Sequence, residues 1–400
     1  MRSKSDKKKS LVPRLRFPEF REAGAWEVKR LGDVAALKNG YAFKSSKYSD
    51  NGAYKVVTIA NVQAGHMSIE DMQRISPLPS DLQTHQKLSA GDILISMTGN
   101  VGRICYVLID DCLLNQRVGK LVPTKIDKEF FYHSIQNGNF QTAMQERAKG
   151  GAQGNLSAKD ILQHVIYYPN NKHEQQKIAH CLSSLDEVIG LQAKKVQALK
   201  QHKKGLMQQL FPAEGETTPR LRFPEFREAG AWDKQRIGDL LSLEYGAPLP
   251  EGSRLEGDIP VIGSNGVVGY HSEPLIKGPA IVIGRKGSAG QVSWIDSPCY
   301  PIDTTFFVDL SRKDCQLRFI YLLLEHHRLQ ELVREGGVPG LNRDDVYAVK
   351  ATISKHTEQQ KIAHCLSSLD EVIGLESHKL DALKNLKKGL MQQLFPQEVA

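Results

Sequence analysis

The chain is 400 residues long, 40% hydrophobic and 24% charged, with a formal net charge of +8 at pH 7. This length predicts two domains with connecting elements, and the composition excludes a disordered chain and a membrane-spanning one, since no apolar run approaches the roughly 20 residues of a membrane helix. An isoelectric point near 9.0 favours a polyanionic partner.

The chain begins with a basic tail, residues 1–12, whose first ten residues read MRSKSDKKKS. Because no apolar stretch follows, this tail is not a secretory signal. We expect a solvated, flexible segment, and the alternative is a weak electrostatic contact with nucleic acid. Behind the tail, Pro13–Trp26 reads PRLRFPEFREAGAW, and the same letters return at Pro219–Trp232.

The first globular domain is predicted at residues 13–173. Within it, Tyr54–Asn61 (YKVVTIAN) and Asp92–Met97 (DILISM) have the β-branched and apolar content of strands, and Glu129–Lys149 is typical of a helix.

A long helix is predicted over residues 174–211, followed by a linker at 212–218. Its apolar residues recur at alternating steps of four and three, the period of a coiled coil. They are Ile178, Leu182, Leu185, Ile189, Val196, Leu199, Leu206 and Leu210. Glu174 is expected in the first turn, where an acid favours the helix dipole.

The second half of the chain repeats this order. A second domain is predicted at residues 219–357, with strands at Ile259–Ile262 and Pro279–Ile283 and a helix at Leu317–Glu335. A second long helix follows at 358–395, and its first eighteen residues, EQQKIAHCLSSLDEVIGL, are identical to Glu174–Leu191. At about 1.5 Å per residue, each helix would be roughly 55 Å long.

Polar residues interrupt the apolar seam of both helices at matching places, Gln192 and Glu376 at one and Lys203 and Lys387 at the other. If the helices pack antiparallel, one register opposes Glu376 to Lys203 and Gln192 to Lys387. Polar pairs of this kind can set the register of a coiled coil. The alternative is two amphipathic helices that each cover their own domain.

Motifs of catalysis and metal binding are missing from the sequence. It contains no GxxxxGK[ST], GxGxxG or HExxH pattern, and without a Pro-Pro dipeptide it lacks the catalytic motif of amino-methyltransferases. Six cysteines without a CxxC pair or zinc-like spacing indicate a reducing, cytoplasmic compartment. We therefore expect no catalytic residue, no metal site and no cofactor in this chain.

Two variable segments alternating with two repeated segments, each with EQQKIA at the start of a long helix, resemble the specificity subunit of Type I restriction–modification enzymes. The resemblance covers nearly the whole chain. It also rests on Arg14–Trp26 and Arg220–Trp232 (RLRFPEF…W), Ile262–Tyr270 (IGSNGVVGY), Gly284–Gly290 (GRKGSAG) and Ile302–Val308 (IDTTFFV).

The resemblance implies an α+β, pseudo-two-fold fold, in which two target recognition domains are joined by two long antiparallel coiled-coil helices. Each domain would read one half of a split site in double-stranded DNA, and the helices would fix the gap. Two modification subunits, and restriction subunits, would assemble on the chain. S-adenosylmethionine, ATP and Mg²⁺ would be bound by those partners, and no membrane would be involved.

The two variable segments share glycine-rich landmarks that carry different polar residues. Residues 99–103 align with 287–291, 114–117 with 302–305, and 150–154 with 336–340. Glycine allows tight turns near a ligand, and polar side chains beside it can bond phosphates and base edges. The candidate DNA contacts are Lys44, Ser45, Asn100, Arg103, Gln116, Arg117, Gln153 and Asn155 in the first domain, and Ser264, Asn265, Arg285, Lys286, Ser288, Thr304, Thr305, Asn342 and Arg343 in the second.

Two other functions remain compatible with the sequence. One is a non-catalytic adaptor that binds a different protein with each domain. The other is a specificity subunit that serves methylation only, without a nuclease partner.

Overall fold

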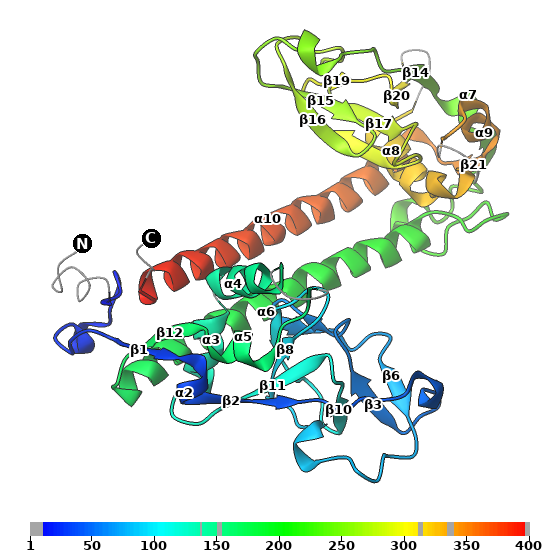
Figure 1. Ribbon diagram of the computed structural model, residues 1–400. Coiled ribbons are helices and arrows are strands. Elements are labelled where there is room, and N and C mark those ends of the chain that lie inside the picture. Colours follow the sequence, from blue (N-terminus) through cyan, green and yellow to red (C-terminus); the bar gives the residue numbers. More distant parts are fainter. Residues whose placement is uncertain (1–10, 137, 150–153, 311–314, 334–339, 397–400) are drawn as a thin grey trace. The chain divides into compact units, whose positions relative to one another are not determined.

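The computed structural model describes residues 11–136, 138–149, 154–310, 315–333 and 340–396. The chain forms two compact units: unit 1 runs to Gln192 and resumes at Lys379, and unit 2 spans Ala193–His378. The two long helices, α6 (Lys172–Leu210) and α10 (His356–Leu394), therefore each begin in one unit and end in the other (Figure 1). Because the units divide both helices, the predicted domains 13–173 and 219–357 remain a proposal.

Unit 1 contains two four-stranded sheets and two strand pairs. In the sheet β6-β3-β10-β7, strands β3 and β10 run parallel, and the other pairs of strands in the described part of the unit are antiparallel. The second sheet has the order β2-β11-β8-β9, and the pairs are β1-β12 and β4-β5. The strands are β1 (Glu27–Arg30), β2 (Ala35–Asn39), β3 (Tyr54–Val57), β4 (Val62–Gln63), β5 (His66–Met67), β6 (Gln73–Ile75), β7 (Lys87–Leu88), β8 (Ile93–Ser96), β9 (Ile104–Tyr106), β10 (Cys112–Leu114), β11 (Val118–Pro123) and β12 (Val165–Tyr168).

Unit 2 follows the same plan with fewer strands. Its sheets have the orders β14-β20-β17-β18 and β16-β15-β19, with a pair β13-β21, and β15 runs parallel to β19 as β3 does to β10. The strands are β13 (Asp233–Arg236), β14 (Ser242–Tyr245), β15 (Ile259–Gly263), β16 (Gly266–His271), β17 (Ala280–Gly284), β18 (Val292–Ile295), β19 (Tyr300–Pro301), β20 (Thr305–Asp309) and β21 (Lys350–Ile353).

Short helices complete each unit. They are α2 (Leu31–Val34), α3 (Lys128–Ile135), α4 (Gly138–Lys149), α5 (Ala158–Leu162), α7 (Ile237–Leu240), α8 (Leu317–His326) and α9 (Arg343–Ala348), with single 3-10 turns at Pro18–Phe20, Ser45–Lys47, Thr84–Gln86, Pro224–Phe226, Glu251–Ser253 and Leu329–Leu332. No helix among the described residues is long and apolar enough to cross a membrane.

Two predicted helices are shorter than expected. The helix expected over Glu129–Lys149 is divided into α3 and α4, next to Gly138, a residue that weakens a helix. The helix expected over Leu317–Glu335 ends at His326, and Arg328 has a φ of 45°, which is incompatible with a continuing helix.

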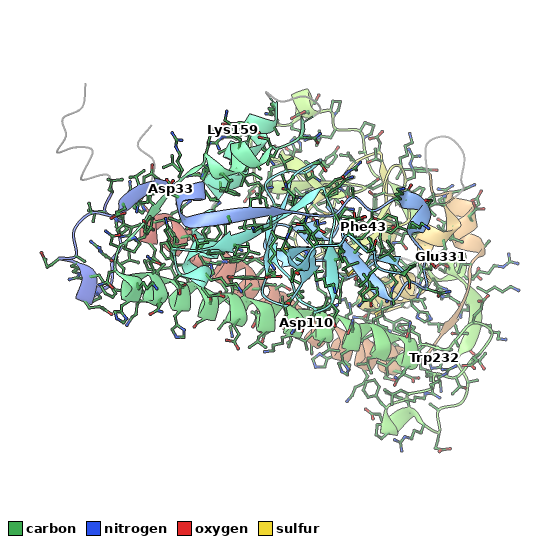
Figure 2. All side chains as sticks on the ribbon, turned by 60° about the horizontal axis from the view of Figure 1, so that its bottom comes forward. Asp33, Phe43, Asp110, Lys159, Trp232 and Glu331 are labelled. Atoms are coloured by element: carbon green, nitrogen blue, oxygen red, sulfur yellow. The ribbon has the colours of Figure 1, made fainter. Side chains whose placement is uncertain are left out.

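The core of each unit includes the end of the long helix that began in the other unit. In unit 1, Trp26 packs edge-on against Phe130 and against Phe395, which follows α10. In unit 2, Trp232 (labelled in Figure 2) packs against Phe211, which follows α6, and both contact Phe319. A unit is therefore completed by chain that lies far away in sequence.

The repeated segment Pro13–Trp26 secures this arrangement. Its Arg16 donates two hydrogen bonds, of 2.7 and 2.8 Å, to the carboxylate of Glu174 at the start of α6. The amide of Leu15 donates to the carbonyl of Gln393 near the end of α10, over 3.0 Å. The segment therefore holds the start of one long helix and the end of the other.

The second copy of the segment repeats these contacts. Arg222 bonds Glu358 over 2.7 and 2.8 Å, and Leu221 donates to Gln209 over 2.9 Å. The identity of the two segments is explained by the identity of the contacts that they make. Glu174 and Glu358 lie in the first turn of their helices, as predicted, and each is also one half of a buried ion pair.

The predicted helix register is wrong. In unit 2, Lys203 binds Asp370 over 2.7 Å instead of Glu376, and Glu376 binds Lys195 over 2.5 Å. The predicted register set Lys195 opposite Lys384. The partner of Lys203 is therefore displaced by six residues and that of Lys195 by eight, so that the mean displacement is one heptad. The segments do run antiparallel, because higher numbers on α6 meet lower numbers on α10.

The equivalent lysine of unit 1 behaves in the same way. Lys387 binds Asp186 over 2.6 Å and the side chain of Gln136 over 2.9 Å, so its predicted pairing with Gln192 is also wrong. A heptad pattern defines register only to within multiples of seven residues. The choice is made by helices outside the pair, because α8 also supplies Glu325 to Lys203 and Gln136 follows α3.

Candidate nucleic-acid interface

In unit 2, four loops predicted to bind DNA converge on one place. The amides of Arg285 and Lys286 donate to the carbonyl of Thr304, over 2.9 and 3.2 Å. The amide of Leu341 donates to the carbonyl of Arg285 over 2.9 Å, and the hydroxyl of Ser264 to the carbonyl of Thr304 over 2.5 Å. The loops at 285–288, 303–304 and 340–343 are thus joined by main-chain hydrogen bonds, and the loop at 264–265 is joined to them by the side chain of Ser264.

Unit 1 holds the matching loops with the same bonds. The amide of Met97 donates to the carbonyl of Arg117 over 3.0 Å, and the amide of Leu156 to the carbonyl of Met97 over 2.8 Å. Met97 therefore corresponds to Arg285, Arg117 to Thr304, and Leu156 to Leu341.

We call this set of hydrogen-bonded loops, which occurs in both units, the loop frame. Glycines at equivalent places make it possible. Gly99 and Gly287 both have a left-handed backbone, with φ of 68° and 74°. At Gly40 and Gly246, which follow β2 and β14, an added Cβ would lie 2.1 Å from the carbonyl oxygens of Asn115 and Ile302. Only glycine permits that approach, which brings the end of the strand against the loop.

The loop alignment made from the sequence is confirmed for one loop and shifted by one residue in the others. Gly99 and Gly102 match Gly287 and Gly290 in both φ and hydrogen bonding. Asn115, however, corresponds to Ile302, and Asn155 to Gly340, because the main-chain bonds of the frame pair them so. Pattern matching across glycine-rich segments cannot resolve a shift of one residue where both registers align glycine with polar residues.

Most of the predicted contact residues lie at the surface of these loops. Exposed side chains are those of Lys44, Ser45, Asn100, Gln116, Arg117, Asn155, Asn265, Lys286 and Asn342, and half-buried ones are those of Arg103, Ser264, Arg285, Ser288, Thr304 and Arg343. Gln153 lies outside the described residues.

Several of these side chains also bond within the protein. Arg103 donates to Gln63 over 2.7 Å, and Asn342 caps α9 by accepting from the amide of Asp344. The prediction that Thr305 contacts DNA is wrong. The residue is 0% exposed, and its hydroxyl donates to the carbonyl of Ile302 over 2.7 Å. Its role is to close the turn from inside.

The two sets of loops place their cations differently. In unit 2, the guanidinium carbon of Arg285 lies 5.1 Å from the ring centre of Tyr245, and that of Arg343 lies 5.4 Å from the same ring. In unit 1, the cation on the loop that corresponds to Thr304 is Arg117. Tyr245 was missed by the sequence analysis, although an aromatic residue directly before the required Gly246 was a usable signal.

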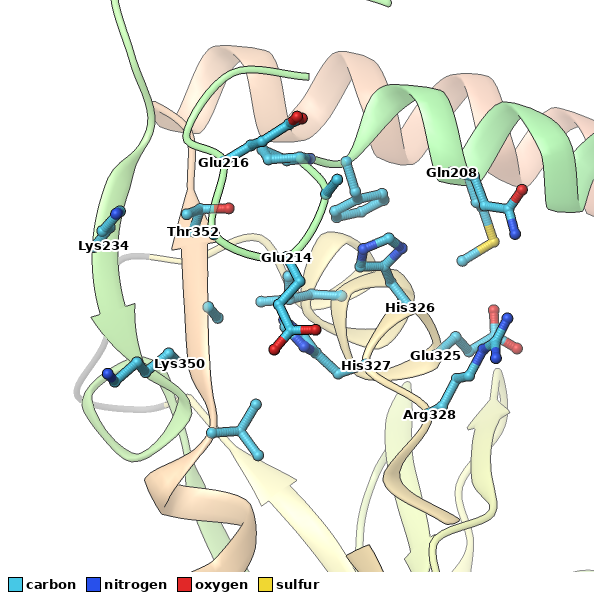
Figure 3. A pocket seen from close by; sticks show the side chains of 18 of the residues that line it. Gln208, Glu214, Glu216, Lys234, Glu325, His326, His327, Arg328, Lys350 and Thr352 are labelled. Carbon is cyan, nitrogen blue, oxygen red and sulfur yellow. The ribbon is translucent and has the colours of Figure 1, made fainter. Parts of the chain in front are cut away.

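A separate cleft of about 1530 Å³ lies in unit 2, where α6 ends (Figure 3). Its lining mixes cations such as Lys234 and Lys350 with acids such as Glu214 and Glu325. His326 stacks on Phe211 at 5.1 Å, and burial lowers the pKa of the neighbouring His327 to about 4. None of the predicted DNA contacts lines this cleft. Across the described residues, no group of three or more His, Cys, Asp or Glu could hold a metal ion.

Known proteins are similar to this chain in sequence and in fold. A family model described as the Type I restriction modification DNA specificity domain matches residues 24–201 and 230–385. The MjaVIII specificity subunit of Methanocaldococcus jannaschii is 29% identical over 197 residues, 46% of this chain and 45% of that protein. The putative MjaX specificity subunit of the same organism is 21% identical over 92% of each chain.

The crystal structure of the S subunit of a Type-I restriction-modification system from M. genitalium has a TM-score of 0.65 at 18% identity. The match covers 97% of this chain and 100% of that one. At this identity the likeness concerns the fold, and it confirms the predicted fold class of two α+β domains with two long helices.

Proposed function

Because the chain belongs to the Type I restriction modification DNA specificity domain family, we propose that it reads an asymmetric, bipartite DNA target and scaffolds two modification subunits, with restriction subunits joining them. Its role is DNA recognition, and the chemistry belongs to its partners. S-adenosylmethionine, ATP and Mg²⁺ are accordingly assigned to those partners.

The observation that carries this proposal is that both units contain the same loop frame but carry different side chains on it. Met97 and Arg285 occupy the same position between the same two main-chain hydrogen bonds, and Arg117 and Thr304 occupy another. Two identical reading surfaces on a repeated frame would select a palindrome. Surfaces that differ at equivalent positions select two different half-sites.

The long helices are suited to fixing the gap between those half-sites. Each has 39 residues, or roughly 58 Å at 1.5 Å per residue, and each is continuous from one unit into the other. The Lys203–Asp370 and Lys387–Asp186 ion pairs oppose sliding of one helix along the other.

The same helices offer two equivalent docking surfaces for modification subunits. Leu191 is 61% exposed and Leu375 is 70% exposed, and they are the same residue of the two identical blocks. Val188 and Val372, three residues earlier, are exposed as well. Exposed apolar pairs favour protein contacts, and their duplication favours two copies of one partner.

The proposal is tested by producing the full chain with the methyltransferase subunit encoded beside it and mapping methylated adenines across the host genome. We expect a split motif with a fixed gap. Replacing residues 33–173 with the matching segment of a relative should change one half of the motif and leave the other half and the gap intact. Methylation without a split motif, or a replacement that alters both halves, would contradict it.

A further inference from the structure

Arg285, Tyr245 and Arg343 form a stack in unit 2. Tyr245 is 49% exposed, and the two guanidinium groups lie 5.1 and 5.4 Å from its ring centre. Arg285 also lies 5.9 Å from the ring of Phe306, and Arg343 lies 5.8 Å from that of Tyr347. Each arginine therefore lies over two aromatic rings, with Tyr245 shared.

The backbone places all three residues independently of any ligand. Arg285 is bonded through its amide to Thr304 and through its carbonyl to Leu341. Tyr245 pairs with Phe306 in the ladder of β14 and β20, directly before Gly246. Arg343 opens α9 behind the capping residue Asn342. Stacking and anchoring together fix the planes of the guanidinium groups before DNA arrives.

The hydrogen-bonding capacity of both arginines is unused within the described chain. The Nε atoms of Arg285 and Arg343 are buried without a hydrogen-bond partner among the described residues. Neither side chain forms any of the salt bridges or hydrogen bonds found there. A guanidinium group that is oriented, half-buried and without a protein acceptor is suited to an external acceptor with two adjacent atoms.

We propose that this stack reads at least one guanine in the half-site bound by unit 2, with Arg285 and Arg343 as the base-reading residues and Tyr245 as the residue that positions them. The inference rests on the proposed function. In the major groove, guanine presents O6 and N7 as paired acceptors that a guanidinium fork matches. Adenine presents a donor beside its acceptor, so a group that only donates cannot satisfy it. Lys286, which is exposed, supplies the mobile charge suited to phosphate.

Unit 1 lacks this stack of two arginines on a tyrosine at the equivalent positions of its loop frame. Met97 stands where Arg285 does, Asn39 where Tyr245 does, and Ala158 where Arg343 does, as the hydrogen bonds and ladder pairings of the two frames show. The guanine requirement therefore belongs to the second half-site and is not a property of the shared frame.

The test uses the full chain produced with its methyltransferase subunit, and reads base preference at each position of the motif from genome-wide adenine methylation. We expect the wild-type half-site assigned to unit 2 to contain a G·C pair. Arg285→Gln and Arg343→Gln should lower discrimination at that half-site by roughly 5- to 150-fold, the range for a lost bidentate contact, while the first half stays unchanged.

Four further variants separate base reading from folding. Arg285→Lys keeps the charge without the fork, and should relax the guanine preference while the chain still supports methylation. Tyr245→Leu should relax the base preference at the same positions. Tyr245→Phe, which keeps the aromatic ring, should retain the wild-type preference. Lys234→Gln, an exposed change on β13, should leave the motif unchanged.

The outcomes distinguish this inference from the function on which it rests. A split motif whose second half has no G·C pair would overturn the guanine assignment and leave the proposed function intact. An equal loss of methylation at all sites, without a change in base preference, would also overturn it and would indicate phosphate contacts. Absence of a split motif in the wild type would contradict the proposed function itself.

Discussion

Arg222 holds Glu358 through two parallel hydrogen bonds, and the two side chains are only 8% and 2% exposed. The carboxylate raises the pKa of the arginine by accepting these bonds. Arg16 and Glu174 form the same pair in unit 1. Removing one partner of a buried pair leaves the other charge uncompensated, which is far more destabilising than losing an exposed ion pair.

Glu358→Gln should therefore lower the stability of unit 2 by about 3 kcal/mol. The effect should be local, and faster hydrogen–deuterium exchange in unit 2 with little change in unit 1 would show it. Glu225→Gln is the matched control, because its ion pair with Lys361 is exposed to solvent and should contribute little to stability. Equal effects of the two changes would contradict the assigned role.

Charge reversal tests the helix register in unit 1. Lys387→Asp or Asp186→Lys alone should lower stability by about 1–3 kcal/mol, because each opposes two like charges and breaks a charged hydrogen bond. The double variant should recover most of that loss, because Gln136 accepts from or donates to either charge. A double variant whose loss equals the sum of the single losses would show that Lys387 and Asp186 are not paired.

Glycine substitutions should act in opposite directions at two kinds of site. Gly246→Ala should destabilise unit 2 by about 1–3 kcal/mol, because its Cβ would meet the carbonyl of Ile302 at 2.1 Å. Gly190→Ala, in the middle of α6 with nothing near its Cβ position, should stabilise the free chain by about 0.5–1 kcal/mol. Denaturant unfolding measures both, and the same sign for the two would contradict the geometry.

Stability should fall as the pH drops from about 6.5 to about 4. Burial lowers the pKa of His133 to about 4, and that of His164 likewise. Their unfolded forms take up protons from about pH 6.5 downwards while the folded forms stay neutral, so protons favour the unfolded state in this window. His133→Gln should make the loss of stability between pH 6.5 and 4 shallower. An unchanged slope would show that His133 titrates normally.

The features that could be predicted from the sequence are those that depend on repetition and periodicity. Two identical blocks defined the frame, and a period of 3.5 residues defined both long helices to within two residues at the start. The helix register could not be predicted, because heptads repeat and the deciding contacts of Lys203 and Lys387 involve residues near α8 and α3. Tyr245 itself could have been noticed beside Gly246, but its contacts with Arg285 and Arg343 could not be predicted, since they join residues far apart in the chain.

The interleaving of the two units has a consequence for protein synthesis. Trp26 and Phe130 emerge early from the ribosome, but Leu394 and Phe395, which complete their core, are translated only after the whole of unit 2. Unit 1 therefore cannot finish folding until all of unit 2 has been synthesised. A message truncated within α10 would yield a product with an unfilled apolar site in unit 1, which proteases could recognise even though every predicted DNA-contact residue had already been made.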